Sequence, residues 1–162
     1  MKSHIREQAA LWEKILPYSA WASATGSLVN AVATKLISDI FDLTDMSVDE
    51  AERAATLISG VEALDLLFIR KSTTSSPRRS MNGTEDAEIP LTSQFADKWM
   101  KMKFLSEVLQ SNLKDVKFLW FESDLSLYFE AGEVVELINL SFESNTGVRQ
   151  AIREIRENPH PK

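Results

Sequence analysis

Residues able to perform acid–base or metal chemistry are few in this sequence. The 162-residue chain has no cysteine and only two histidines, His4 and His160. Both histidines lie near a terminus, where a fraying chain does not hold a base or a metal ligand in a fixed position. The lack of cysteine removes disulfides, thiolate nucleophiles and thiolate metal sites, and it is typical of a reducing compartment. The sequence therefore predicts no enzyme activity, no metal site and no cofactor.

Two other patterns contain the right residue types for a site but not the right spacing. Four carboxylates follow each other closely, and the five glycines are scattered rather than clustered after a strand. A charged first turn of a helix explains the carboxylates, and the glycine spacing does not support nucleotide binding. These carboxylates are Asp45, Asp49, Glu50 and Glu52.

One short segment has the pattern of a regulatory site. Ser76 is followed by a proline and two arginines, in the order Ser-Pro-Arg-Arg. A phosphate on Ser76 would add negative charge beside Arg78 and Arg79, so Ser76 is a candidate phosphorylation site. Together with Arg70 and Lys71, the same arginines form a small basic loop that could contact anionic lipid headgroups.

The most unusual stretch is DKWMKMKFLSEVLQSNLKDVKFLW, which spans residues 97–120. Its lysines lie between apolar residues, and two interpretations stay open. In the first, the lysines form the solvated face of a helix whose Trp and Met residues pack on a neighbour. In the second, the same side chains form a protein interface, because Trp, Met and cations supply adaptable contact area. The candidate interface residues are Lys98, Trp99, Lys101 and Lys103.

The composition limits the classes of partner. With 18 Lys and Arg against 24 Asp and Glu, the net charge is -6, so the overall field opposes nucleic-acid phosphates and anionic lipid. The N-terminal residues lack the pattern of a signal peptide, and no apolar run is long enough to span a bilayer. We therefore expect a soluble cytoplasmic protein that does not bind nucleic acid and contacts membranes only peripherally.

Apolar residues recur at spacings of three and four along most of the chain, which predicts an all-α bundle of about five or six helices. We expect helices over residues 5–16, 18–43, 48–68, 100–120, 133–142 and 146–157. In the helix over residues 18–43, the inward face is predicted to contain Trp21, Ala24, Leu28, Val32, Leu36 and Ile40. Ser47 and Glu50 predict a capping box, Asn145 predicts a helix N-cap, and FESDLSLYF (121–129) predicts a short helix or connector.

The periodicity stops between residues 70 and 90, where Ser, Thr, Pro, Gly and charged residues predict a flexible surface loop. We therefore divide the chain into N-terminal helices (1–69), this loop (70–90) and C-terminal helices (91–162) of the same domain. An alternative function follows from the loop, namely a phosphorylation-regulated adaptor module that binds its partner through residues 70–90.

Three blocks of sequence, in order, resemble the C-terminal region of the Zeste-white-ten family, whose members are related to Dsl-type tethering proteins. The resemblance covers about residues 28–155, and the chain departs from the animal pattern by having Lys101-Met102 where a Pro-Phe pair would follow Trp-Met. The first block is Leu43 to Arg53. The second contains Lys98-Trp99-Met100, Leu105, Leu109-Gln110, Leu113 and Trp120, and the third contains Phe129, Glu133-Val134, Leu137-Ile138, Phe142, Asn145-Thr146 and Arg149.

The resemblance implies a non-enzymatic scaffold that is part of a rod-like multisubunit-tethering (CATCHR-type) protein. Such a subunit acts at the endoplasmic reticulum in capturing retrograde vesicles from the Golgi. Its implied partners are a large helical solenoid subunit, called NAG or Sec-thirty-nine, and other tether subunits and SNARE proteins through the rest of the full-length chain. The alternative that the resemblance implies is a spindle-checkpoint scaffold with Rod and Zwilch at the kinetochore in mitosis.

Overall fold

The computed structural model describes residues 2–69 and 91–161, and this part of the chain consists of helices and connections without a strand. The all-α prediction is confirmed. The predicted loop over residues 70–90, including Ser76, lies outside the described residues. The helices are α1 (Lys2–Glu13), α2 (Tyr18–Phe41), α3 (Val48–Glu62), η1 (Ala63–Leu67, a 3-10 helix), α4 (Thr92–Phe95), α5 (Trp99–Gln110), α6 (Leu113–Phe121), α7 (Leu125–Tyr128), α8 (Ala131–Ser141) and α9 (Thr146–Glu157).

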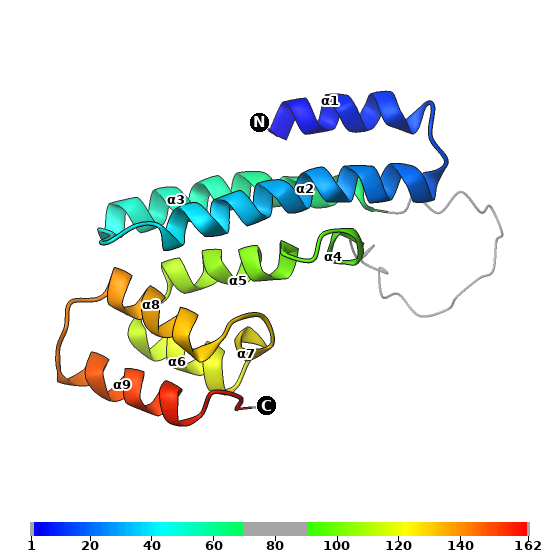
Figure 1. The fold of residues 1–162 in the computed structure, drawn as a ribbon. Helices are drawn as coiled ribbons and strands as arrows, with labels where there is room; N and C mark the ends of the chain where they lie inside the picture. The colour runs from blue at the N-terminus through cyan, green and yellow to red at the C-terminus, as the bar shows by residue number, and fades with distance from the viewer. Residues whose placement is uncertain (1, 70–90, 162) are drawn as a thin grey trace, which may run out of the picture.

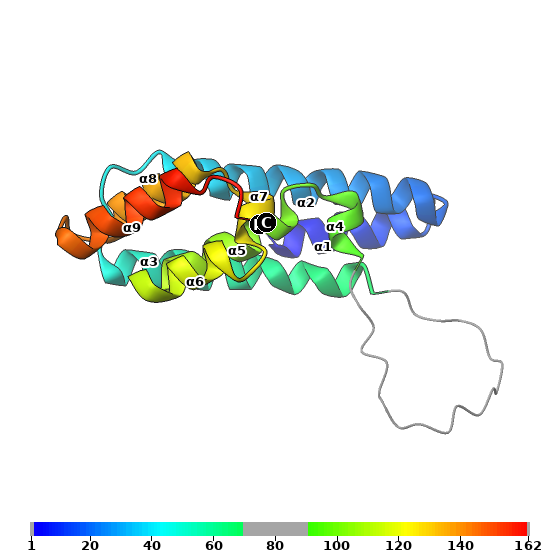
Figure 2. The ribbon, with the colours of Figure 1, turned by 90° about the horizontal axis from the view of Figure 1, so that it is seen from below.

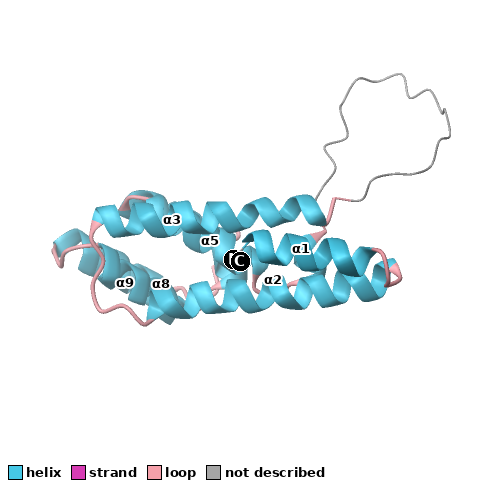
Figure 3. Cartoon of the chain, turned by 90° about the horizontal axis from the view of Figure 1, so that it is seen from above, coloured by secondary structure: helices cyan, strands magenta, loops and turns pink. Residues whose placement is uncertain are grey.

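Two helices, α2 and α3, run antiparallel along the length of the molecule (Figure 1), but they lie apart, with α1 and α5 between them (Figure 3). Helix α1 folds back on α2 and contacts η1, while α5 packs against both α2 and α3 from the other side. Figures 2 and 3 show this arrangement from below and from above. Helices α6, α7 and α8 then cover the side of α5 that faces away from α2 and α3, and α9 packs on α6 and α8 (Figure 1).

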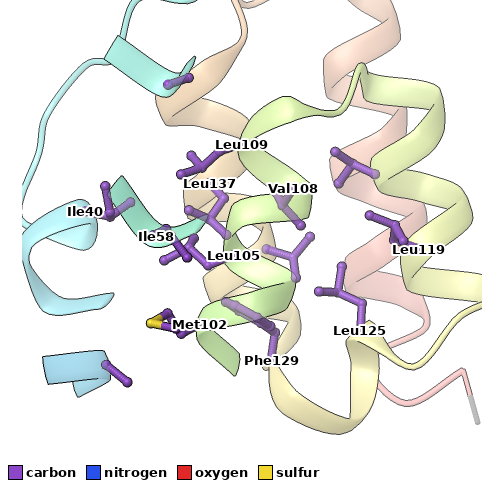
Figure 4. Close-up of a cluster of buried hydrophobic side chains, with 14 of the residues drawn as sticks. Ile40, Ile58, Met102, Leu105, Val108, Leu109, Leu119, Leu125, Phe129 and Leu137 are labelled. Atoms are coloured by element: carbon purple, nitrogen blue, oxygen red, sulfur yellow. The ribbon is translucent and has the colours of Figure 1, made fainter. Parts of the chain in front are cut away.

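Helix α5 is the centre of the hydrophobic core. Figure 4 shows side chains from α3, α6, α7 and α8 gathered around Met102, Leu105 and Val108. Each of these three side chains is at most 3% exposed. Full burial of one apolar side chain of this size stabilises a fold by about 1.5–3 kcal/mol. Because α5 contacts helices before and after residues 70–90, this burial connects the two halves of the chain.

The helix starts follow local sequence signals. The Ser47–Glu50 capping box is confirmed, because the Ser47 N–H donates to the Glu50 carboxylate and the Glu50 N–H donates to the Ser47 hydroxyl. The Ser47 N–H and the Ser47 hydroxyl both donate to the Glu50 carboxylate and lower its pKa. Asn145 is confirmed as the N-cap of α9, where its side-chain oxygen accepts a hydrogen bond from the Val148 N–H. The hydrogen bonds from the backbone N–H groups of Ser47, Glu50 and Val148 satisfy donors that have no partner within the helix.

The single helix predicted over residues 100–120 is wrong, since two helices, α5 and α6, replace it. The break lies at Ser111 and Asn112, both in extended conformation. The Asn112 side chain accepts hydrogen bonds from the backbone N–H groups of Lys114 and Asp115, and so starts a new helix. Two short helices, α4 and α7, also raise the helix count of the described residues above the expected five or six. Of these, α7 agrees with the prediction of a short helix or connector over residues 121–129.

The inward face of α2 also differs from the prediction. Trp21 and Ile40 are buried as expected, but four of the six predicted core residues are only half-buried: Ala24, Leu28, Val32 and Leu36. Smaller side chains take the fully buried positions, namely Ala22, Thr25, Gly26, Val29 and Ala33. This rotation lets the backbone of α4 approach α2 closely at Gly26, where an added Cβ would overlap the backbone and Cβ of Phe95.

The predicted helix over 48–68 ends earlier than expected. Helix α3 stops at Glu62 and continues as the 3-10 helix η1, in which Leu64 is buried, and Phe68 directly after η1 is buried as well. Phe68 packs between Trp21 and Phe95, with ring centroids 5.8 and 5.9 Å away. The tighter turn therefore directs two apolar side chains into the core.

We expect Gly26→Ala to destabilise the protein by about 1–3 kcal/mol in urea unfolding, because the new methyl group must displace the backbone at Phe95. This loss exceeds the gain of about 1 kcal/mol that alanine brings inside a helix. Gly132→Ala is the matched control, since no atom lies within 4 Å of a Cβ added there. Equal effects of the two substitutions would contradict the close approach.

Candidate functional site: an interhelical groove and the lysines of α5

The four candidate interface residues lie around the start of α5, which begins at Trp99. Lys98 is exposed, and its backbone N–H donates to Asn30 Oδ1 on α2 at 2.8 Å. Trp99 is only 1% exposed, so its ring belongs to the core of the domain. Its indole N–H has no hydrogen-bond partner among the described residues.

Lys101 and Lys103 form ion pairs within the domain rather than pointing freely into solvent. Lys101 pairs with Glu133 at the start of α8, and its ammonium lies 4.7 Å from the centroid of the Phe129 ring. Lys103 pairs with Asp65 of η1. The two lysines therefore connect α5 to helices on its opposite sides. Of the four candidates, Lys98 is the one with an exposed side chain, and partner binding by these residues stays a prediction.

Glu133 has two structural roles. One carboxylate oxygen pairs with Lys101, and the other accepts a hydrogen bond from the Glu130 N–H at 2.9 Å, at the start of α8. The Lys101 and Glu133 side chains are 13% and 31% exposed, so water screens this pair less than a surface pair. The contact therefore positions α8 on α5.

We expect Lys101→Met to lower the free energy of unfolding by about 1–3 kcal/mol, since it removes the cation and leaves the Glu133 carboxylate partly buried without it. Lys35→Met is the matched control, because the Lys35–Asp39 pair is largely exposed and such pairs contribute about 0.3–0.5 kcal/mol. Urea unfolding followed by circular dichroism measures both. A loss no larger than that of the control would remove Lys101 from the anchoring role.

A groove opens where the start of α3 meets the ends of α5 and α8. Its volume is about 540 Å³, and its apolar lining comprises Met46, Val48, Ala51, Leu109 and Phe142. Val48 is 73% exposed, which makes it one of the most accessible large apolar side chains of the described residues. The Ser141 hydroxyl lines the same groove and is buried without a partner among the described residues. Sequence analysis missed this groove, because its walls come from segments far apart in the chain.

The electrostatic character of the groove is negative. Glu52 is the charged residue among its lining side chains, and Asp49 and Glu50 lie in the same first turns of α3. Helices α5 and α8 both end at the groove, and neither has a basic residue in its last turn. The starts of α3 and α6 line the same groove, and their partial positive charge offsets the partial negative charge of these C-termini. The acidic side chains therefore decide the sign, and the groove favours a ligand that combines apolar side chains with positive charge.

A shallower depression continues along α3 and α5 and shares Thr56 and Gln110 with the groove. Glu62 lines it, and burial raises the pKa of Glu62 above its ordinary value, with the nearby Lys103 opposing the effect and Asp65 adding to it. The folded protein thus holds a proton on Glu62 more strongly than the unfolded chain does. The resulting stabilisation is fully present below the unfolded pKa of about 4.3 and is lost as the pH rises through the folded pKa.

We therefore expect Glu62→Gln to be more stable than the wild type at pH 7, with the difference shrinking as the pH falls to about 3.5, near which the wild-type carboxyl is protonated in both states. Urea unfolding at a series of pH values measures this difference. Glu136→Gln, an exposed change on α8, is the control and should show a smaller effect at pH 7. An advantage of Glu62→Gln that grows at low pH would contradict the sign.

Within residues 2–69 and 91–161, no group of three or more His, Asp or Glu side chains is arranged to hold a metal ion. No helix in the same ranges has the length and apolar character needed to cross a membrane.

The comparison with known proteins decides the family. The sequence model of a family described as the ZW10 C-terminal helical domain matches residues 2–155. The chain belongs to this family. The match confirms the resemblance to the Zeste-white-ten family, and it extends into the first 25 residues, for which the sequence blocks gave no resemblance.

The curated relatives are much longer than this chain. The centromere/kinetochore protein zw10 homologs of Rattus norvegicus and Mus musculus are each 25% identical over 155 residues, which is 94% of this chain and 19% of the relative. The centromere/kinetochore protein zw10 of Drosophila pseudoobscura pseudoobscura is 24% identical over 147 residues. The chain thus spans about a fifth of the length of these relatives. No solved structure matches it significantly.

Proposed function

We propose that this chain is a non-enzymatic scaffold domain of a tethering-complex subunit for Golgi-to-endoplasmic-reticulum retrograde transport. The family match over residues 2–155 is the observation that carries the proposal. The helices before and after residues 70–90 act as one docking unit in this proposal, since α5 contacts both α2 and α3. The domain then works in the cytoplasm, at the surface of the endoplasmic reticulum.

The proposed partner is the large helical solenoid subunit of the tether, of the NAG or Sec-thirty-nine type. The groove between α3, α5 and α8 supports this choice of partner class, because an amphipathic helix can place apolar side chains against Val48 and Phe142 and a cation beside Glu52. Lys98 is the exposed member of the α5 cluster and a second candidate contact. Other tether subunits and SNARE proteins would bind elsewhere on a longer chain.

A second candidate is a scaffold of the Rod–Zwilch complex at the mitotic kinetochore. The names of the relatives from rat, mouse and fruit fly favour it, because all three are called centromere/kinetochore proteins. The two functions need the same kind of surface, namely a docking site for a helical solenoid. They differ in which solenoid binds and at which stage of the cell cycle.

The test is affinity purification of the tagged protein from its own cells, in interphase and in mitosis, followed by mass spectrometry. A tether subunit of the solenoid class should co-purify in interphase. We expect Val48→Lys combined with Glu52→Lys to reduce its recovery at least about tenfold, because the pair removes an apolar contact and reverses a charge in the groove.

Leu127→Lys combined with Glu136→Lys is the matched control, since it changes an exposed leucine and an exposed glutamate on α7 and α8. Undiminished recovery with the groove variant would exclude the groove as the docking site. Recovery of a kinetochore solenoid alone would support the second candidate. Deletion of residues 73–88 tests the adaptor alternative, because a partner bound through that loop would be lost while a partner of the groove would be kept.

A further inference from the structure

A basic face on α9 is separate from the groove and is unexplained by the packing of the domain. Val148, Ala151 and Ile155 of this helix are buried. One flank of the exposed side contains three arginines, Arg149, Arg153 and Arg156. Their spacings of four and three residues place them on one face of the helix, over about 10 Å of its length. We call these three residues the α9 arginine face.

The arginines have no ion pair among the described residues, although α9 also contains carboxylates. Glu154 lies toward the opposite flank, where it pairs with Lys117 of α6 and accepts a hydrogen bond from Gln150. These bonds lower the pKa of Glu154. This carboxylate is thus engaged with α6, while Glu157 lies at the end of a shallow depression formed with the three arginines and Ile152.

The position of the charges is unfavourable for the isolated helix. Like charges at these spacings repel each other, and Arg149 lies near the N-terminal end of α9, where the helix dipole disfavours a cation. The first turn of α9 has no acidic residue to offset it. Arg156, in the last turn, is the one arginine that the dipole favours. An anionic ligand along this face would relieve the repulsion.

We propose that the α9 arginine face binds an acidic helical segment of a partner protein. Carboxylates at the same spacings on a partner helix would meet the three guanidinium groups in register. Each carboxylate could then accept two hydrogen bonds from one guanidinium group. Ile152, half-buried beside the arginines, offers an apolar contact between the two helices. This partner is the electrostatic opposite of the cationic segment expected in the groove, so one domain can hold two different chains.

An anionic membrane fits the α9 arginine face less well. Lipid-binding clusters usually contain about 4–8 Lys and Arg, against three here, and the net charge of -6 repels an anionic surface. The large exposed apolar residues of the described chain lie on other elements, so α9 has no such side chain to insert into a bilayer. A carboxylate-bearing protein segment is therefore the favoured ligand.

The test uses a fluorescein-labelled helical peptide with glutamates at positions i, i+4 and i+7, and a control peptide with glutamines there. Fluorescence anisotropy measures binding to the 162-residue protein. We expect the glutamate peptide to bind at least about tenfold more tightly than the control, and to weaken between about 50 and 300 mM sodium chloride. Equal binding of the two peptides would overturn the proposal.

The protein variant is Arg149→Gln combined with Arg153→Gln and Arg156→Gln, and it should bind the glutamate peptide at least about tenfold more weakly. Lys14→Gln combined with Lys35→Gln and Arg53→Gln is the control, because it has the same net charge and alters exposed residues directly after α1, on α2 and on α3. Equal losses in the two variants would overturn the proposal. In addition, the triple arginine variant should have a thermal midpoint no lower than that of the wild-type protein, because it removes the repulsion among the three arginines, and this midpoint shows that the variant is folded.

Two further measurements identify other ligands. Arginine-dependent binding to phosphatidylserine vesicles, without preference for the glutamate peptide, would replace the proposal with a lipid site. Concentration-dependent association in sedimentation velocity that the triple arginine variant abolishes, again without peptide binding, would identify a second copy of the chain as the ligand. Failure of the groove variants to affect partner recovery has no bearing on these results, because the groove is formed by α3, α5 and α8.

Discussion

The burial of α5 is the constraint on which the rest of the domain depends. This helix bridges α2 and α3, which lie apart, on one side and contacts α6, α7 and α8 on the other. Met102 and Leu105 are fully buried. A polar side chain at either position would therefore lose its hydrogen bonds to water, and its burial would cost free energy. The lysines that begin the helix then fix its direction through Glu133 and Asp65. Apolar burial holds α5 in place, and the ion pairs select its orientation.

The alternation of Lys and Met at the start of α5 is thus explained by packing on several sides. A helix that is surrounded needs apolar residues around most of its circumference, and its cations must find carboxylates on neighbouring helices. Lys101 and Lys103 have such partners, and the Lys103 ammonium also lies 5.9 Å from the centroid of the Trp99 ring. The proposed binding surfaces are therefore the groove, the α9 arginine face and, at the start of α5, the exposed Lys98.

The sequence was sufficient to predict that the chain is helical and where most of the helices lie. It was not sufficient to predict which face of α2 is buried or where α5 ends and α6 begins. Amphipathic periodicity and the caps at Ser47 and Asn145 were sufficient for α3 and α9, since these signals are local. The break at Asn112 was missed because the apolar stripe continues across it, and side-chain capping there outweighs periodicity. The rotation of α2 depends on its contact with Phe95. The groove depends on contacts between segments far apart in the chain, such as Met46 before α3 and Ser141 at the end of α8. Such contacts have no signal in a single sequence.

The attachment of α1 has a consequence for how the domain opens. A small separate cluster of Ala9, Trp21 and Ala22, with a hydrogen bond from the Trp21 indole N–H to the Ala9 carbonyl oxygen at 2.7 Å, fixes this helix to α2. The main core is buried by other helices, with Ile5 as the fully buried apolar contribution of α1. Local unfolding of α1 therefore requires less free energy than global unfolding. We therefore expect the amide protons of α1 to exchange in a sub-global opening, before those of α5.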